Sequence, residues 1–242
     1  MSDSRLIDDH RAAWENKPAL RAIYADYHQR IASKCNSGRT LEIGSGGGNM
    51  SSLVPNTVSI DIQKAPWLDV IADAQILPFA DGSFENIIML DVLHHLRSPR
   101  IFMSEVTRVL TPSGRLIMIE PEITPLSYVA LSAFHPEPVL LSVDPLSDDY
   151  QSGQDPEDAN QAIPHLLFRR HRKQFEEKFP ELRCLCLKRL STLAYPLSGG
   201  FRSWCLVPRF MVRFLLKLED ILMPLLGPLA AFRLLIVIER KP

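Results

Sequence analysis

Apolar and polar positions alternate along the first half of the chain in a way that predicts strands and helices in turn. Between residues 39 and 120 the apolar runs are short, which is typical of buried strands. Residues 99–110 instead carry apolar side chains at helical spacing. Strands that alternate with helices indicate a parallel sheet with helices on both faces. The predicted strands are residues 40–43, 58–61, 70–73, 86–90 and 114–119.

The segments on either side of this core follow other patterns. Residues 10–33 have helical spacing and predict a helix that Pro18 kinks or divides. Residues 121–164 are rich in proline and acidic residues, lack a long periodic segment and are predicted to form a long loop. The remaining predictions are a helix over 165–179 and strands over 183–194 and 232–239.

The stretch 196–231 is dense in apolar residues, and we expect Pro224, Gly227 and Pro228 to break it. No apolar run in it reaches the roughly 18 residues of a membrane-spanning helix. One interpretation is helix packing over the sheet. The other is a lid or interfacial helix that admits a lipophilic substrate, with peripheral membrane contact through residues 204–230.

No segment has the composition of a linker, so residues 1–242 are predicted to form one α/β domain. We expect an N-terminal helical cap over 1–38 and a ligand-binding core over 39–120. The segments 121–164 and 196–231 are predicted to be insertions that form a substrate lid.

Composition excludes several classes of function. The hydrophobic share of 46% provides a core, and the formal net charge of -1 gives no reason to expect a nucleic-acid partner. The first ten residues lack the apolar region of a signal peptide. The four cysteines show neither metal-ligand spacing nor a disulfide framework, which favours a reducing cytoplasm and predicts no metal site. Two of them, Cys184 and Cys186, are predicted to share one face of a strand.

A glycine-rich loop follows the first predicted strand, in the sequence Glu42-Ile-Gly-Ser-Gly-Gly-Gly-Asn49. Glycines there let the backbone turn sharply and let a ligand approach it closely. The dinucleotide pattern G-x-G-x-x-G would require a glycine at position 49, which is Asn49. Glu42 beside the loop suits a cationic ligand better than a pyrophosphate.

Two further acids stand at the ends of the next strands. Asp61 closes the second strand, where a carboxylate can accept hydrogen bonds from ribose hydroxyls. Asp73 closes the third strand and can accept from an exocyclic adenine amine. Either acid alone could equally be a helix cap. Three acids at successive strand ends behind a glycine loop favour a nucleoside-containing ligand.

Residues 39–120 resemble the core of class I S-adenosylmethionine-dependent methyltransferases, in particular the small-molecule group called methyltransferase type 11. The resemblance rests on the glycine loop, on Asp61, and on three longer motifs. These motifs are Asp73-Ala74 with 77–84, Leu90-Asp91-Val92-Leu93-His94-His95-Leu96, and 105–114. One departure is Glu85-Asn86, where the family usually has an acid directly after the phenylalanine; the acid survives as Glu85.

This resemblance implies a Rossmann-like, seven-stranded, mostly parallel sheet with an antiparallel last strand, and S-adenosylmethionine as cofactor. It assigns Glu42 and the glycines to the amino-acid end of the cofactor, Asp61 to the ribose, and Asp73 with Ala74 to the adenine. The cofactor-binding residues expected are Glu42, Gly44, Ser45, Gly46, Asp61, Ile62, Asp73, Ala74 and Asp91.

Candidates for the chemistry lie where the strands end, because ligands of such sheets bind at that edge. His94 and His95 are the candidate catalytic residues, since histidine titrates near neutral pH and suits a general base. A packed or capping histidine pair is the alternative. Glu120, Glu122 and Tyr195 follow later strands. The candidate acceptor-binding residues are Tyr27, Phe201, Arg202 and Trp204.

The sequence therefore predicts methyl transfer from S-adenosylmethionine to a small, hydrophobic organic acceptor. Two alternatives stay open at this point. An NAD(P)-dependent oxidoreductase is disfavoured by Asn49 and Glu42. A non-catalytic protein that binds the cofactor or a membrane is compatible with the sequence, because methyl transfer requires no particular catalytic residue.

Overall fold

The computed structural model describes residues 13–46, 50, 53–150 and 159–242. Its centre is a seven-stranded sheet with the strand order β3-β2-β1-β4-β5-β7-β6. Six strands run in the same direction, and β7 runs antiparallel to both of its neighbours, as predicted. The strands are β1 (Thr40–Ile43), β2 (Thr57–Asp61), β3 (Val70–Ile71), β4 (Phe84–Leu90), β5 (Leu110–Pro121), β6 (Leu182–Leu190) and β7 (Arg233–Arg240).

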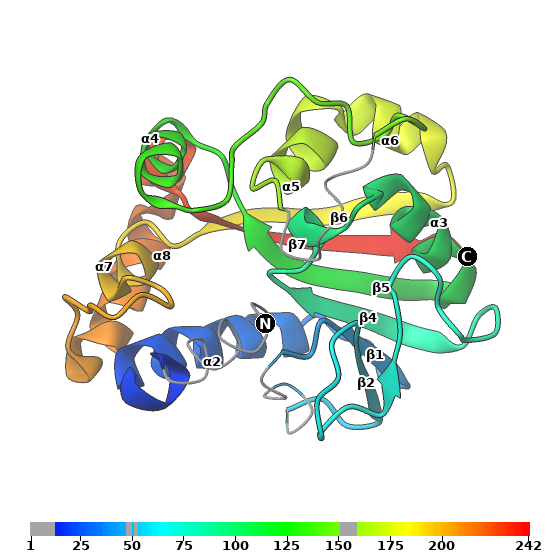
Figure 1. The fold of residues 1–242 in the computed structure, drawn as a ribbon, viewed down its shortest axis with the longest axis horizontal. Coiled ribbons are helices and arrows are strands. Elements are labelled where there is room, and N and C mark those ends of the chain that lie inside the picture. The colour runs from blue at the N-terminus through cyan, green and yellow to red at the C-terminus, as the bar shows by residue number, and fades with distance from the viewer. Residues whose placement is uncertain (1–12, 47–49, 51–52, 151–158) are drawn as a thin grey trace.

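The central strands are apolar because helices cover both of their faces. All four residues of β1 are buried, and seven of the eight residues of β7 are buried. One face packs against α3 (Pro99–Val109) and α6 (Arg172–Lys178), and the other packs against α2 (Pro18–Ala32) and α8 (Arg209–Ala230). Figure 1 shows α3 and α6 above the sheet and α2 below it.

The parallel strands all end at the same edge of the sheet, and Figure 1 shows α4, α7 and α8 gathered beyond that edge. Helix α4 spans Pro125–Phe134 and α7 spans Ala194–Ser198. Between β4 and α3 lies a short 3-10 helix, η1 (Leu93–His95). Helix α5 (Ile163–His165) continues as the π-helical turn η2 (Leu166–Arg170).

The N-terminal helix is divided as predicted. Residues 13–16 are helical, Lys17 interrupts the helix, and α2 begins at Pro18. Proline suits this first position because its missing N–H would have no partner there.

Three predictions about the second half of the chain are wrong. The predicted loop 121–164 contains the helix α4, which Thr124 and Ser127 cap reciprocally. The predicted strand 183–194 ends at Leu190, and α7 begins at Ala194. Helix α8 continues through Pro224 and Pro228, because buried residues from Val212 to Gly227 hold it against its neighbours, which include α2, α4 and β6.

The two cysteines of β6 face opposite sides of the sheet, contrary to prediction. A bulge lies between Cys184 and Cys186, and it adds one residue to the strand. Cys184 therefore packs with α6, whereas Cys186 packs with the layer that contains α2.

Candidate active site

A cavity of about 2420 Å³ lies at the edge where the parallel strands end. Its wall includes the glycine loop and the ends of β2, β3 and β4. The rest of its lining includes residues of α4, of the segment 135–143 and of the turn 199–204. A ligand site in this position is typical of open α/β sheets. All nine predicted cofactor-binding residues line this one cavity.

The glycine loop begins with two residues in the left-handed region. Gly44 has a φ of 69° and Gly46 a φ of 47°. A Cβ added to Gly44 would lie 2.2 Å from Val92 Cγ2, so the turn admits only glycine there. A Cβ on Gly46 would meet nothing closer than the Gly44 carbonyl oxygen at 3.8 Å, so its backbone borders open cavity. Gly47, Gly48 and Asn49 lie outside the described residues.

Glu42 places a buried carboxylate in the wall of the cavity beside this loop. Its side chain is 5% exposed, and Ser59 Oγ donates a hydrogen bond to Oε2 at 2.7 Å. Burial raises the pKa of Glu42, partly offset by hydrogen bonds from Ser59 and Ser45. A cationic group bound beside it would stabilise the charged form.

Asp61 and Asp73 each fold the chain at a strand end and still face the cavity. Asp61 accepts hydrogen bonds from the amides of Gln63 at 3.0 Å and Gly46 at 3.2 Å. Asp73 accepts from the amide of Gln75 at 2.8 Å. Both acids thus form tight turns, and neither is the cap of a following helix. Ile62 and Ala74 lie beside them in the cavity wall.

Asp91 follows β4 with a φ of 59° and already has two protein partners. Tyr24 donates to Oδ2 at 3.0 Å, and Arg233 forms an ion pair with Oδ1. Arg233 in turn lies over the ring of Tyr195, 4.2 Å from its centroid. The network joins α2, β4 and β7 at the floor of the cavity. Asp91 therefore contributes a carboxylate whose charge is largely balanced by Arg233.

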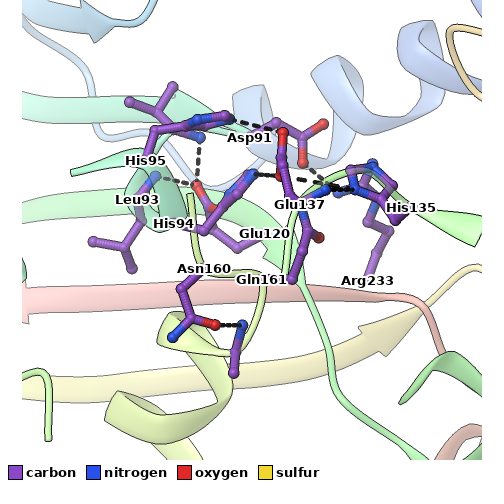
Figure 2. A network of polar contacts seen from close by, with 12 residues as sticks. Asp91, Leu93, His94, His95, Glu120, His135, Glu137, Asn160, Gln161 and Arg233 are labelled. Carbon is purple, nitrogen blue, oxygen red and sulfur yellow. Dashed lines mark hydrogen bonds and ion pairs between the residues drawn. The ribbon is translucent and has the colours of Figure 1, made fainter. Parts of the chain in front are cut away.

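His94 and His95 belong to a cluster that links three separate segments (Figure 2). Glu120, at the end of β5, accepts from the amides of Val92 and Leu93 at 2.8 Å each and bonds His94 Nδ1 at 2.7 Å. On its other side, His94 Nε2 lies 3.6 Å from Glu137 Oε2. His94 thus sits between two carboxylates and is almost fully buried.

The two histidines have opposite charge preferences. Burial alone would lower the pKa of His94, but the hydrogen bonds and charges of Glu120 and Glu137 outweigh it and raise the pKa to about 10. Burial, together with the charge of His94, lowers the pKa of His95 to about 4. His95 lies with its Nε2 3.9 Å from Glu137 Oε1 and with its ring centroid 4.2 Å from that of His94. At neutral pH, His94 is an imidazolium and His95 a neutral imidazole.

Three of the four predicted acceptor-binding residues line the cavity, namely Phe201, Arg202 and Trp204. The turn that carries them is tied to the N-terminal segment by Lys17, whose ammonium donates to the carbonyl of Arg202 at 2.9 Å. The fourth, Tyr27, does not line the cavity. Its ring is 1% exposed, and its hydroxyl bonds Ser191 Oγ at 2.5 Å in the core. Tyr24, one turn earlier, lines the cavity and contacts Phe201 edge to face.

The chain is similar to known methyltransferases over its core. Residues 41–118 match the family described as methyltransferase domain. Over 96 residues the chain is 30% identical to the demethylmenaquinone methyltransferase of Renibacterium salmoninarum. This alignment covers 34% of this chain and 40% of that protein. Over 110 residues it is 31% identical to phthiotriol/phenolphthiotriol dimycocerosates methyltransferase 1 of Mycobacterium ulcerans. This second alignment covers 38% of this chain and 41% of that protein.

A solved structure extends the likeness to the whole fold. The SAM-dependent methyltransferase from Archaeoglobus fulgidus superposes with a TM-score of 0.53 at 13% identity, and the match covers 94% of this chain and 96% of that one. Residues 41–118 are thus similar to a methyltransferase domain, and the fold is that of S-adenosylmethionine-dependent methyltransferases. The sequence alignments span about two fifths of the two curated relatives, so they concern this methyltransferase core alone.

The residues of the methyltransferase core fit S-adenosylmethionine. Gly46 leaves open space against its backbone, which a ligand can occupy. Glu42 offers a buried carboxylate to the cationic amino-acid end, and Asp61 and Asp73 offer acceptors to hydroxyl and amine groups farther along the same wall. This donor and acceptor set matches a zwitterionic nucleoside better than it matches a pyrophosphate.

Sequence patterns missed two charged residues of the site. Glu137 lies in the predicted loop, 42 residues beyond His95, and no periodicity marks it. Arg233 is the first residue of the last strand, and nothing in the sequence distinguishes it from other charged residues at strand ends. Glu122, which was a candidate, is buried against Arg189 and Arg169 and does not line the cavity. The other two candidates, Glu120 and Tyr195, belong to the networks described above.

Proposed function

We propose that this methyltransferase core transfers a methyl group from S-adenosylmethionine to a small hydrophobic organic acceptor. The observation that carries the proposal is the single cavity that joins the glycine loop and its acids to an aromatic wall. Tyr24, Phe201 and Trp204 form that wall. Two of the similar methyltransferases are named for lipid compounds, demethylmenaquinone and phthiotriol dimycocerosates, which supports a hydrophobic acceptor.

When bound, S-adenosylmethionine would supply an electrophilic methyl group to a nucleophilic atom of the acceptor, with S-adenosylhomocysteine as the leaving group. The protein's part is to hold the two reactants in line and to exclude water. Glu42, Asp61 and Asp73 fix the cofactor along one wall, and the aromatic residues enclose the acceptor on the other.

The charges of the histidine cluster divide the roles of His94 and His95. His94 is protonated and bonded to Glu120, so it cannot take a proton from the acceptor at neutral pH. Its role is to position Glu137 and the ring of His95. His95 is neutral and about one third exposed to the cavity, so it can accept a hydrogen bond from an acceptor hydroxyl and take its proton as the methyl arrives.

Calorimetric titration with S-adenosylhomocysteine tests the cofactor half of the proposal. We expect one binding site per chain for S-adenosylhomocysteine and none for NADH. Gly46→Val should abolish binding, because the side chain would occupy the open space against the loop. Gly82→Val is the matched control, since Gly82 also has a positive φ and open space but lies outside the cavity.

The control variant should bind like the parent protein. Equal binding by Gly46→Val and the parent, with both folded, would show that the cofactor lies elsewhere. Tight binding of NADH would support an oxidoreductase instead.

A second assay separates an enzyme from a non-catalytic binding protein. The protein is incubated with S-adenosylmethionine labelled in its methyl group and with an organic-solvent extract of cells. We expect labelled product with the parent protein and with Gly82→Val, and none with Gly46→Val. Binding of S-adenosylhomocysteine without any labelled product from such extracts would contradict the enzymatic proposal.

A further inference from the structure

Exposed apolar side chains are concentrated at one end of the molecule. Of the 21 large hydrophobic side chains that are exposed among the described residues, 13 lie between residues 126 and 134 or between 197 and 229. Contiguous apolar surface of this kind is uncommon on a protein surface and marks an interaction site. These exposed apolar side chains therefore indicate a surface that binds a partner.

Helix α8 shows the concentration most clearly, because its outer face is apolar. Its inner face buries Val212, Glu219, Met223 and Gly227 against the rest of the protein. On the outer face the exposed fractions are 83% for Phe210, 62% for Phe214, 74% for Ile221 and 75% for Leu225. A helix at a protein surface normally presents polar residues to water on that side.

Helix α4 extends the same apolar surface. It packs against α8, and Figure 1 shows both helices at the same end of the molecule. Leu126, Val129 and Phe134 are 50%, 61% and 68% exposed. We call the outer faces of α4 and α8 the apolar end face.

Basic side chains follow one side of this apolar end face. Arg209, Arg213 and Lys217 are one helical turn apart and exposed on α8. None of the three forms an ion pair with any residue that the structure describes. The acid on the same stretch of helix, Asp220, is already paired with Arg30 at 2.7 Å. The end face thus combines exposed apolar groups with unpaired positive charge.

The apolar end face is continuous with the mouth of the active-site cavity. Phe134 of α4 and Trp204 line the cavity, and both are also exposed at the surface, at 68% and 42%. A hydrophobic molecule could therefore pass from whatever covers the end face into the cavity without crossing water.

We propose that the apolar end face docks on a lipid bilayer that carries anionic headgroups. The apolar side chains of α4 and α8 enter the boundary between headgroups and acyl chains, and Arg209, Arg213 and Lys217 contact the headgroups. In the described residues no helix is sufficiently long and apolar to cross a bilayer, so α8 lies along its surface. The inference rests on the proposed function in one respect, because it names the membrane as the source of the hydrophobic acceptor.

Flotation with vesicles tests the docking without any methyl transfer. The full chain is mixed with phosphatidylcholine vesicles that contain either no anionic lipid or roughly 30% phosphatidylglycerol, which gives the vesicle surface a negative potential. We expect binding to the anionic vesicles, and at least tenfold weaker binding to the neutral ones. The double variant Phe210→Ser/Phe214→Ser should lose at least tenfold in binding to the anionic vesicles. Ile101→Ser is the matched control, because Ile101 is an exposed apolar residue on α3.

Charge reversal separates the two contributions. Arg213→Glu/Lys217→Glu should reduce binding to the anionic vesicles at least tenfold and leave binding to neutral vesicles unchanged. Both groups of variants should bind S-adenosylhomocysteine like the parent, which distinguishes a failure of docking from a failure of the proposed function.

The rival occupant of the end face is a second copy of the chain. Sedimentation velocity of the parent protein and of Phe210→Ser/Phe214→Ser measures this directly. A dimer that the double variant dissociates, together with no vesicle binding, would overturn the proposal. Vesicle binding that both double variants leave intact would overturn it as well, because the end face would then not be the contact.

Discussion

Replacing His94 by glutamine should change how the stability of the protein depends on pH. His94 is 3% exposed, and its pKa of about 10 in the folded protein compares with 6.5 for an ordinary histidine. A group whose folded pKa is raised contributes stability that is complete below pH 6.5 and is lost as the pH rises toward 10. Glutamine fills a similar volume and does not titrate, so His94→Gln removes this contribution.

The magnitude follows from the two pKa values of His94. Between pH 6.5 and 10 the contribution falls by about 1.4 kcal/mol per pH unit, so the whole shift corresponds to on the order of 5 kcal/mol. Glu137 determines how the stability falls at low pH. Burial alone would raise the pKa of Glu137, but the histidines around it outweigh burial and lower this pKa to about 2. Its contribution is present above pH 4.5 and is lost as the pH falls toward 2. The cluster therefore stabilises the fold most between pH 4.5 and 6.5.

The assay is urea unfolding of the parent protein and His94→Gln at pH 5.5, 7.0 and 8.5. The stability difference between them should shrink by about 2–3 kcal/mol from pH 5.5 to 8.5. His171→Gln is the control, since His171 lies on the surface and bonds only Gln174 at 2.6 Å among the described side chains. A difference that does not vary with pH would show that His94 is neutral in the folded protein, and the division of roles between His94 and His95 would then be refuted.

Three further predictions concern the loop, the ribose site and the acceptor wall. Gly44→Ala should lower the free energy of unfolding by about 2–5 kcal/mol, because its Cβ would clash with Val92 at a positive φ; Val92→Ala in the same chain should restore part of the loss in a thermal melt. Asp61→Ala should weaken S-adenosylhomocysteine binding roughly tenfold to a hundredfold, and an unchanged dissociation constant in calorimetry would show that Asp61 only shapes the turn. Phe201→Ala and Trp204→Ala should leave that constant within about twofold and lower kcat/KM for methyl transfer at least tenfold, a loss of about 1.4 kcal/mol; transfer at the parent rate would remove them from the acceptor site.

The sequence predicted the sheet well, and it placed the candidate cofactor residues at one edge of the sheet, because both depend on local patterns. Buried parallel strands are short apolar runs, and β1, β2, β4 and β5 each contain the run that predicted them. Glu42, Asp61 and Asp73 each lie within two residues of the end of a strand. The predicted strands alone therefore placed these acids at the same edge of the sheet.

The errors arise where tertiary packing overrides a local signal. Pro224 normally interrupts a helix, but the buried face of α8 holds the helix together across it. In α4 the apolar residues are not confined to one face, so periodicity failed to reveal the helix, although the Thr124-Pro125 start was readable as a cap. One inserted residue at the β6 bulge reversed the faces of Cys184 and Cys186.

The histidine cluster could be predicted only in part. His94 and His95 were identified from their place after a strand, but their opposite charges depend on Glu120 and Glu137. Glu137 reaches His94 only because the chain after α4 folds back over the strand ends (Figure 2). A contact between residues 43 positions apart leaves no local pattern in one sequence.

Methyl transfer into an organic phase shows whether the cavity methylates a hydrophobic acceptor. The full chain is incubated with S-adenosylmethionine labelled in its methyl group and with vesicles prepared from total cellular lipid, and the reaction is then partitioned between chloroform and water. We expect label in the chloroform phase with the parent protein, none with Gly46→Val, and strongly reduced label with Trp204→Ala. Label that stays in the aqueous phase, or equal incorporation by the parent and Gly46→Val, would contradict the claim that this cavity methylates a hydrophobic acceptor.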